Sequence, residues 1–566
     1  MNRQIMKRIL FLLLAFVSLS TGFSASKEVG NKAVLNLITY APDGTLLRSG
    51  YGFYISEEGQ AVASFNLFKG AARAVAVDGK GKEYPVLRIL GANSTYDLVK
   101  FTVAPAKKIE YLPLSTSGAE IGETLVLPYY STNKKDKPLS AAVQQASDYN
   151  GYKYYDITAA NEEKIIGCPL LDKDGYVVGV VQKNLLENAS TACAIDARFA
   201  ANLKITSVSA LNADLRKIFI PKAIPSDEKE ALAYLYMLGR TDSVMVATAM
   251  ADFVAAYPDN VDIHIERAVF YASRADYLAA ENDYKVALAL CEKNGLKEKA
   301  AEVHYNFSKT LFASLSMPHA AESWTIARAL EEAELACAVD THSLYRVQRA
   351  DCLFADKKYT EAYTAYLELA KGWMSTPEMY YRAARSLELS GGDSLQVIAL
   401  LDSTVSRLPR PLSTVSARYV LERANRLAAA ERYRDAVLDL NDYEKAVGPN
   451  RLPAHFYYMR HQMELSARMY QQAIDDIRRA VSLKPTEPLY RLEEAYILLR
   501  VGLYEETCTA ASEALKLAPD NSAGHKLLGI ASGELGRKDE ALEHLRRAAA
   551  LGDTDTDTYI KKYSAQ

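Results

Sequence analysis

The sequence predicts a protein of two parts, an all-β region followed by an all-α region of repeated helical hairpins. The chain has 566 residues, which is too long for a single hydrophobic core. From Ala33 to about residue 196, short apolar runs alternate with turn residues at the spacing of strands. After Pro221 to Ser226, the apolar residues recur at helical spacing instead. The fold class is therefore multidomain, with β structure first and α structure second.

The N-terminus predicts export. Basic residues precede an apolar run at Ile9 to Val17, and small residues follow through Ser24 to Ser26. This is the pattern of a secretory signal peptide, which we place at residues 1–26. The run is too short to span a bilayer comfortably, and no second run of spanning length follows. We expect a periplasmic or extracellular protein with no transmembrane segment in its mature form.

Composition narrows the classes of partner and cofactor. Lys and Arg number 67 against 70 Asp and Glu, for a net charge of −3, which gives no reason to expect nucleic acid as a partner. No glycine-rich phosphate loop or dinucleotide motif stands out, and no cysteine or histidine pair has metal-ligand spacing. We expect no cofactor and no metal.

The first region reads as a series of short strands separated by turns such as Pro42-Asp43-Gly44 and Asp174-Gly175. Strands at this spacing favour a sandwich or a barrel. The candidates are 34–40, 45–55, 84–90, 98–103, 124–127 and 177–181.

Three segments of this region resemble trypsin-like serine proteases of the HtrA type. Gly167-Cys168-Pro169-Leu170, with Gly175 and Gly179 after it, is similar to the nucleophile segment Gly-Asn-Ser-Gly-Gly-Pro-Leu. Gly50-Tyr51-Gly52-Phe53 and Asp97-Leu98 match earlier segments in the same order. The resemblance implies a trypsin-like double β-barrel over residues 27–210, and it also favours a bacterial origin.

The same register implies that the catalytic triad is incomplete. It places Ile166 at the serine position, Asn66 at the histidine position and Asp97 at the aspartate position. Isoleucine cannot attack a carbonyl and asparagine cannot accept a proton near neutral pH, so only Asp97 is retained. Residues 1–263 contain no histidine at all, which excludes an imidazole base in any register. The domain is therefore predicted to be an inactive pseudoprotease.

Cys168 is the remaining candidate nucleophile. Without a histidine, its thiolate fraction would stay small unless a cationic neighbour lowered its pKa. Two other interpretations stay open, a buried packing role and a disulfide with Cys193, the other cysteine of this domain. The alternative function is accordingly a divergent endopeptidase that uses Cys168, with the helical region recruiting substrate.

The helical region carries an internal repeat. Ala495, Gly502, Tyr504, Ala514 and Pro519 each have a counterpart 34 residues later. This pattern resembles the tetratricopeptide repeat (TPR), and earlier segments carry parts of it. We place eight or nine helical hairpins at 227–566, after a linker at 211–226. One hairpin cannot bury its apolar face alone, so the repeats are expected to stack into a superhelical solenoid with a concave groove.

The predicted function follows from these two parts. An inactive trypsin-like domain joined to a TPR groove suggests an exported, non-catalytic adaptor or scaffold that binds a protein or peptide. Tyr381, Tyr457 and Tyr490 stand near repeat starts and are candidate groove contacts, with core packing as the alternative role. The sequence leaves the partner and the oligomeric state open.

Overall fold

The computed structural model describes residues 32–104, 108–133, 136–186, 189–239, 243–317, 321–372 and 374–565. The predicted signal peptide, residues 1–26, lies outside these ranges. The chain divides into two compact units, Met1–Ala268 and Val269–Gln566.

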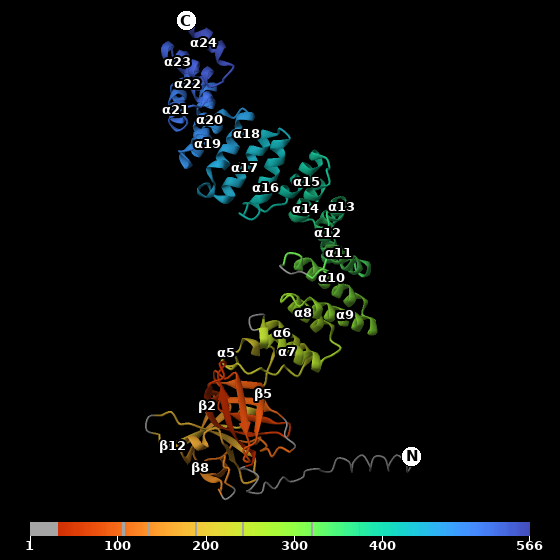
Figure 1. Cartoon of the computed structure of the whole chain (residues 1–566). Helices are drawn as coiled ribbons and strands as arrows, with labels where there is room; N and C mark the ends of the chain where they lie inside the picture. The colour runs from red at the N-terminus through yellow and green to blue at the C-terminus, as the bar shows by residue number, and fades with distance from the viewer. Residues whose placement is uncertain are drawn as a thin grey trace. The chain divides into compact units, whose positions relative to one another are not determined.

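Two closed antiparallel β-barrels of six strands each form the main body of the first unit (red to orange in Figure 1), which confirms the predicted double barrel. The first barrel has the order β1-β2-β3-β6-β5-β4, and the second has the order β10-β11-β12-β9-β8-β7. Their bounds are β1 Val34–Tyr40, β2 Leu46–Tyr54, β3 Gln60–Ala63, β4 Arg73–Val77, β5 Glu83–Asn93, β6 Leu98–Val103, β7 Thr124–Leu127, β8 Leu139–Tyr149, β9 Tyr152–Ala160, β10 Pro169–Leu171, β11 Val177–Gln182 and β12 Thr191–Asp196.

Side-chain alternation explains why these segments form barrels. In β1, the buried residues alternate along much of the strand, as expected where one face meets a core. In β11, all six residues are buried, and the strand is apolar from Val177 to Val181 before it ends at Gln182. Each barrel closes by pairing its outermost strands, Asn36 with Val77 in the first and Leu171 with Val126 in the second.

One buried cluster joins the two barrels. It includes Phe53 and Val62 of the first barrel together with Tyr155 and Ile195 of the second. Cys168 is part of the same cluster. The barrels therefore share a core, and the cleft described below lies where they meet.

The segment expected to be a linker, 211–226, packs on the first barrel. After the short helices α4 (Arg198–Asn202) and α5 (Ala213–Arg216), the N–H of Phe219 donates to the carbonyl of Ala71 at 2.7 Å. Ile89 of β5 exchanges two backbone hydrogen bonds with this segment, donating to Pro221 and accepting from Ala223. Ile218 is fully buried there.

The first two helices of the repeat region also belong to the first unit. They are α6 (Glu228–Leu238) and α7 (Ser243–Ala256). Arg88 of β5 donates two hydrogen bonds to the carboxylate of Asp252 in α7, at 2.7 and 2.9 Å. The first barrel and this hairpin are thus joined by a bidentate ion pair.

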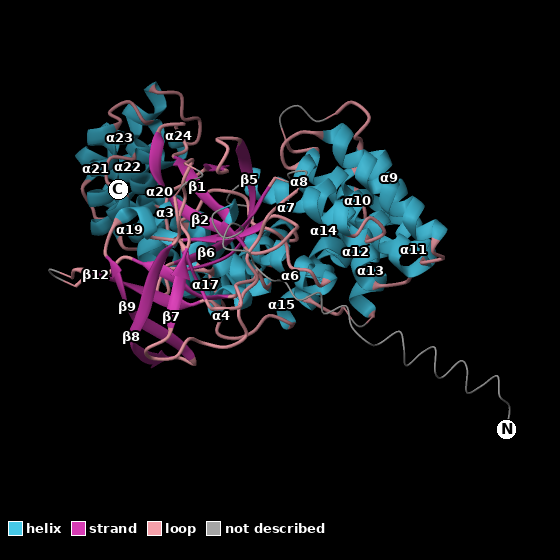
Figure 2. Ribbon diagram, turned by 90° about the horizontal axis from the view of Figure 1, so that it is seen from below, coloured by secondary structure: helices cyan, strands magenta, loops and turns pink. Residues whose placement is uncertain are grey.

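The described residues beyond the barrels form a repeat-like array of nineteen α-helices, α6 to α24 (cyan in Figure 2), which confirms the predicted helical solenoid. The helices after α7 are α8 Val261–Ala272, α9 Tyr277–Lys293, α10 Lys297–Ser314, α11 Ile326–Val339, α12 Ser343–Ala355, α13 Tyr359–Lys371, α14 Pro377–Leu389, α15 Ser394–Ser406, α16 Ala417–Ala429, α17 Tyr433–Val447, α18 Ala454–Ser466, α19 Tyr470–Leu483, α20 Pro488–Arg500, α21 Tyr504–Leu517, α22 Ser522–Glu534, α23 Lys538–Ala550 and α24 Thr556–Ser564.

The turn inside the hairpins explains the glycine of the repeat pattern. Gly502 and Gly536 have φ of 80°, the left-handed conformation that glycine adopts without a Cβ penalty. Other hairpins place Lys357, Glu431 and Arg468 at the same turn with φ near 60°. Each such residue costs roughly 1 kcal/mol or more in this conformation, a cost that the packed helices on either side offset.

Buried ion pairs link successive hairpins of the second unit. Arg423 of α16 bonds Asp439 of α17 through two nitrogens, at 2.6 and 2.7 Å, and Asp402 of α15 at 2.9 Å. Arg460 of α18 does the same with Asp476 of α19, at 2.6 and 2.8 Å. The three aspartates stand 37 residues apart in sequence. Each arginine thereby fixes its own hairpin and also contacts the preceding one.

Within the part of the chain that the structure describes, no helix has both the length and the apolar character needed to cross a membrane.

Candidate functional site

A cleft of about 850 Å³ lies between the two barrels. It brings together the three triad-equivalent positions inferred from the sequence, Asn66, Asp97 and Ile166. The other lining residues are Arg48, Ser49, Gly50, Tyr51, Ser64, Leu67, Ser94, Thr95, Tyr154, Asp156, Glu163, Gln182, Lys183, Asn184, Leu185, Leu186 and Cys193.

A close backbone contact holds one wall of this cleft. Gly167 has φ of 85°, and a Cβ on it would lie 2.2 Å from the carbonyl oxygen of Tyr51. Only glycine fits this position, because any side chain would overlap that oxygen. The turn before β10 is therefore pressed against β2, next to Ile166.

The Asp97 carboxylate organises the first-barrel side of the cleft. It accepts a hydrogen bond from Ser64 Oγ at 2.7 Å and another from the backbone N–H of Asn66 at 2.9 Å. Asp97 itself has φ of 47°, a left-handed conformation that aspartate tolerates better than most residues. These bonds fix the start of α3 (Phe65–Phe68), the short helix that carries Asn66.

Burial raises the pKa of Asp97 above its ordinary value, while the hydrogen bonds from Ser64 and Asn66 act in the opposite direction. The group has no imidazole to orient, since its neighbour is an amide. Asp97 therefore positions backbone and hydroxyl groups here.

The serine position offers neither a nucleophile nor a free oxyanion donor. Ile166 is half-buried in the cleft wall. Its N–H donates to the carbonyl of Glu163 at 3.3 Å, within a 3₁₀ turn that spans Glu163–Ile165. An oxyanion hole needs N–H groups aimed at the reacting carbonyl oxygen. At this residue, the donor is already used inside the chain.

Cys168 lies outside the cleft lining and is fully buried. Burial raises the pKa of its thiol to about 12, so the thiolate population at neutral pH is negligible. Its Sγ donates to the carbonyl of Lys164 at 3.7 Å. Of the roles considered for it, this geometry fits packing in the shared core.

Cys193 is a free thiol that does line the cleft. Its Sγ lies 2.7 Å from the hydroxyl of Tyr154, a distance within hydrogen-bond range. Burial raises the pKa of Cys193, and the contact with Tyr154 opposes that shift. In this structure Cys168 and Cys193, the pair considered for a disulfide from the sequence, are both free thiols.

The rim of the cleft on the side of the second barrel has polar side chains held by hydrogen bonds and an ion pair. Exposed apolar side chains lie beside them. Asn161 donates to the carbonyl of Asn184 at 2.9 Å and accepts from the N–H of Asn184 at 3.1 Å. Lys183 forms an ion pair with Glu163. Leu185 and Leu186 are 85% and 75% exposed at this rim, which is unusual for leucine side chains beside a concave surface.

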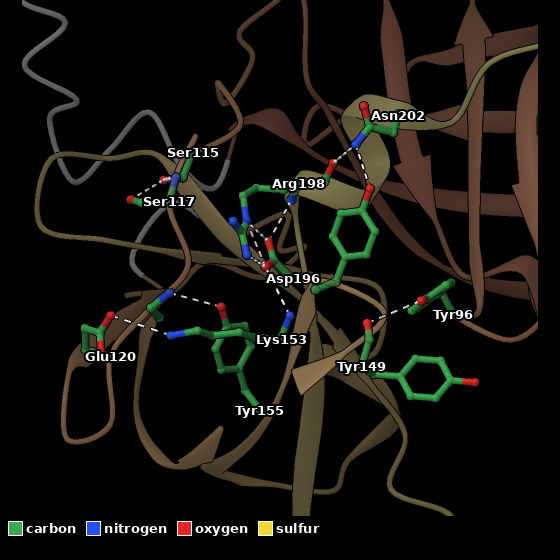
Figure 3. A network of polar contacts seen from close by, with 12 residues as sticks. Tyr96, Ser115, Ser117, Glu120, Tyr149, Lys153, Tyr155, Asp196, Arg198 and Asn202 are labelled. Atoms are coloured by element: carbon green, nitrogen blue, oxygen red, sulfur yellow. Dashed lines mark hydrogen bonds and ion pairs between the residues drawn. The ribbon is translucent and has the colours of Figure 1, made fainter. Parts of the chain in front are cut away.

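A buried carboxylate network joins β9 and β12 of the second barrel (Figure 3). Asp196 is fully buried and accepts hydrogen bonds from the Arg198 guanidinium and from the N–H of Lys153 at 3.2 Å. Tyr155 accepts a hydrogen bond from the N–H of Ala119 at 3.0 Å. A buried charge that is paired and hydrogen-bonded in this way helps to hold one arrangement of the strands.

The candidate groove tyrosines of the helical region occupy packed positions. Tyr457 and Tyr490 are only 2% and 7% exposed, and Tyr457 donates to Glu444 at 2.9 Å. Tyr381 is half-buried and packs edge-on against Tyr419. These contacts match the packing alternative for Tyr457 and Tyr490. By contrast, Tyr496, on the same helix α20 as Tyr490, is 43% exposed.

Comparisons with known proteins agree with both parts of the fold. The family model described as trypsin-like peptidase domain matches residues 50–180. TPR repeat-containing thioredoxin TDX of Arabidopsis thaliana is 30% identical over 99 residues, which is 17% of this chain and 26% of that protein. The chain thus spans about a quarter of the length of this curated relative.

Solved structures that match include two bacterial proteases. The serine endoprotease from Yersinia pestis is 16% identical, with a TM-score of 0.27 over 31% of this chain and 63% of its own. The active form of Rv3671c protease from M. tuberculosis is 20% identical, with a TM-score of 0.27 over 33% of this chain and 85% of its own. By the family model, residues 50–180 are similar to trypsin-like peptidase domains, and the helical repeats after them fit the TPR.

Sequence reasoning missed several cleft residues. Tyr154 belongs to an aromatic run in β9, and only the register of that strand decides which of its side chains reach the cleft. Leu185 and Leu186 follow β11, where an apolar pair beside a strand gives no sign of exposure. No sequence signal connects Asn161 to Asn184, because their contact depends on how two loops meet.

Proposed function

We propose that this protein is an exported, non-catalytic adaptor that binds a protein or peptide partner. One observation carries the proposal: a cleft of about 850 Å³ retains Asp97 but has Asn66 and Ile166 where a base and a nucleophile are needed. No histidine occurs in residues 1–263, so the domain itself supplies no imidazole. Binding is the function that remains for a cleft without reacting groups.

The endopeptidase alternative loses its nucleophile. Full burial of Cys168 and a pKa of about 12 remove both access and thiolate. Cys193 reaches the cleft, but burial raises the pKa of its thiol too. We therefore assign no residue of this cleft as the nucleophile of a peptidase.

The cleft offers a strand edge for an extended peptide. Among the described strands, β2 pairs with β1 along nearly its whole length but with β3 only from Gly52 onward. The part of β2 before Gly52 lines the cleft from Arg48 to Tyr51. An extended peptide can add to such an edge through main-chain hydrogen bonds without any catalytic group. Leu185 and Leu186, across the cleft, would then cover an apolar side chain of the peptide.

The helical repeats support the same kind of role. TPR-type solenoids present extended surfaces to partners, and stacked hairpins leave one face of each first helix open. Export rests on the predicted signal peptide at residues 1–26. Because the protein would be exported, its partner would also lie in the periplasm or outside the cell.

Active-site labelling tests the loss of catalysis. We expect the mature protein to remain unlabelled by a fluorophosphonate and by a thiol-reactive peptide aldehyde. Ile166→Ser should also stay unlabelled, because a serine without a base is a poor nucleophile. Labelling of the wild type that Cys168→Ala abolishes would reinstate the peptidase.

Peptide selection tests the binding role. A random peptide library passed over the mature protein should be enriched in sequences that bind with micromolar affinity or better. Leu185→Glu with Leu186→Glu should weaken those peptides by about tenfold or more, because a charge replaces exposed apolar contact area. Ile121→Glu is the matched control, since Ile121 is also exposed, at 64%, but does not line the cleft. An unenriched library, or equal effects of the two changes, would refute the cleft as the binding site.

A further inference from the structure

Two histidines converge near the end of the helical region. The Nδ1 atoms of His525 in α22 and His544 in α23 lie 3.0 Å apart. Their rings are stacked at an angle of 26°, and both are half-exposed. Solvent and small ions therefore have access to the pair.

The hydrogen bonds fix how each ring carries its proton. His525 Nε2 lies 2.9 Å from the carbonyl oxygen of Pro519, so Nε2 donates and Nδ1 carries the lone pair. His544 Nδ1 must then donate to His525 Nδ1. A second ring nitrogen that donates to a backbone carbonyl is also the usual support of a metal-binding histidine.

The separation of the two nitrogens matches coordination of one ion. Imidazole nitrogens bind first-row metals at about 2.0 Å, so two of them at a right angle lie about 2.8 Å apart, against about 3.3 Å for a tetrahedral angle. The observed 3.0 Å is nearer the right angle. Square-planar or tetragonal geometry is the preference of Cu²⁺ and Ni²⁺.

The surroundings keep the pair available to a cation. Both rings lie at the surface of the α22–α23 hairpin, where an ion can reach their nitrogens from solvent. Glu540 and Glu543 act on His544 with negative charge. Among the described residues, no set of three or more His, Cys, Asp or Glu is placed to hold a metal ion. Water must therefore complete the coordination.

We propose that His525 and His544 form a binding site for a divalent transition-metal ion, with Cu²⁺ or Ni²⁺ preferred over Zn²⁺. On binding, the proton of His544 Nδ1 moves to its Nε2, so both rings remain neutral and both Nδ1 lone pairs face the ion. The site links α22 to α23, and the ion would hold the last full hairpin together.

Titration of the mature protein with Cu²⁺ tests this proposal, by calorimetry and by electron paramagnetic resonance. The expected result is one ion bound with the hyperfine pattern of two nitrogens. His525→Gln and His544→Gln should each weaken binding by about tenfold or more and reduce the pattern to one nitrogen. His455→Gln is the control, because His455 is an exposed histidine on α18 without a histidine neighbour, and should change neither readout.

Circular dichroism of each variant checks that the helices are retained. Equal Cu²⁺ affinity of the wild type and the His525→Gln/His544→Gln double variant would overturn the proposal, and the pair would then be a hydrogen bond between two helices only. Tighter binding of Zn²⁺ than of Cu²⁺ at the same site would overturn the stated preference.

Discussion

The carboxylate of Asp97 accepts a hydrogen bond from the backbone N–H of Asn66 at 2.9 Å. In the resembling proteases, the residue at the Asp97 position orients a histidine at the position of Asn66. In the register proposed from the sequence, Asn66 stands at the histidine position, and here Asp97 holds the backbone of that residue.

Replacement of Asp97 should loosen the cleft. Asp97→Ala removes the acceptor for Ser64 and Asn66 and places alanine at φ of 47°. We therefore expect the free energy of unfolding to fall by about 2–3 kcal/mol. Asp97→Asn keeps an acceptor and tolerates the left-handed conformation, and should cost about 1 kcal/mol. Hydrogen exchange of α3 and β6 would measure the two variants. Equal exchange in both would mean that these hydrogen bonds do not hold the cleft.

Gly167 should be the least replaceable glycine of the cleft. Alanine there would place its Cβ 2.2 Å from the Tyr51 oxygen, in addition to the strain of φ at 85°, and should cost about 3 kcal/mol or more. Gly122→Ala is the matched control, because Gly122 has φ of 84° and nothing within 4 Å of the added atom. It should cost about 1–2 kcal/mol. Thermal unfolding of the two variants separates the effect of the Tyr51 contact from that of the backbone strain. Similar losses of stability in both variants would show that the chain around Tyr51 shifts easily to make room.

Arg460 should matter far more than a surface arginine. Its side chain is 7% exposed and it binds the carboxylate of Asp476 through two nitrogens. Arg460→Met leaves buried carboxylates unpaired, which should cost about 3–5 kcal/mol. Arg547→Met, in an exposed pair with Asp520, should cost less than about 1 kcal/mol. Urea denaturation followed by tryptophan emission reports on the second unit, because both tryptophans of the sequence fall within residues 269–566.

Glu464 should make the same region sensitive to pH. Its side chain is 3% exposed, and its Oε2 has no hydrogen-bond partner. Burial and the nearby Asp476 carboxylate raise its pKa to about 8. A carboxyl with a raised pKa stabilises the fold below the unfolded pKa and loses that contribution as pH rises through the folded value. Stability of α18 and α19 should therefore fall between about pH 5 and pH 8.

Hydrogen exchange of α18 from pH 6 to pH 9, corrected for intrinsic rates, measures this effect. The charged groups that act on Glu464 are Arg460 on its own helix and Asp475 and Asp476 on α19. Glu444 on α17 and His461 on α18 act on Asp476. Glu464→Gln should remove most of the pH dependence, while Glu505→Gln, in an exposed pair with Arg537, should leave it unchanged. A slope that persists in Glu464→Gln would assign it to another group.

The sequence was sufficient to predict the barrels because their signals are local. Glycines mark turns, and apolar residues alternate in β1 as the pleat requires. The sequence also indicated Asn66, Asp97 and Ile166 as members of one site, and all three line one cleft in the structure. The hydrogen-bond partners of Asp97 could not be predicted from the sequence. The bond from Ser64 spans 33 residues and depends on the left-handed backbone at Asp97.

The repeats show the same division between local and long-range information. Gly502 and Gly536 signal a left-handed turn directly, whereas Glu431 and Arg468 adopt that turn without any residue preference for it. Aromatic residues at repeat starts suggested groove contacts, yet Tyr457 and Tyr490 are buried by their neighbours. Burial of a large side chain depends on how successive hairpins stack, and no single segment encodes that stacking.

The packing of 213–223 and α7 on the first barrel bears on how this protein emerges from the ribosome. The last barrel strand ends at Asp196, but Phe219 bonds the loop before β4, and Pro221 and Asp252 bond β5. The barrel therefore cannot reach its final packing until about sixty further residues have been synthesised. Termination or proteolytic cutting before α7 would leave β5 without its cover, and such fragments should be the ones that quality-control proteases remove.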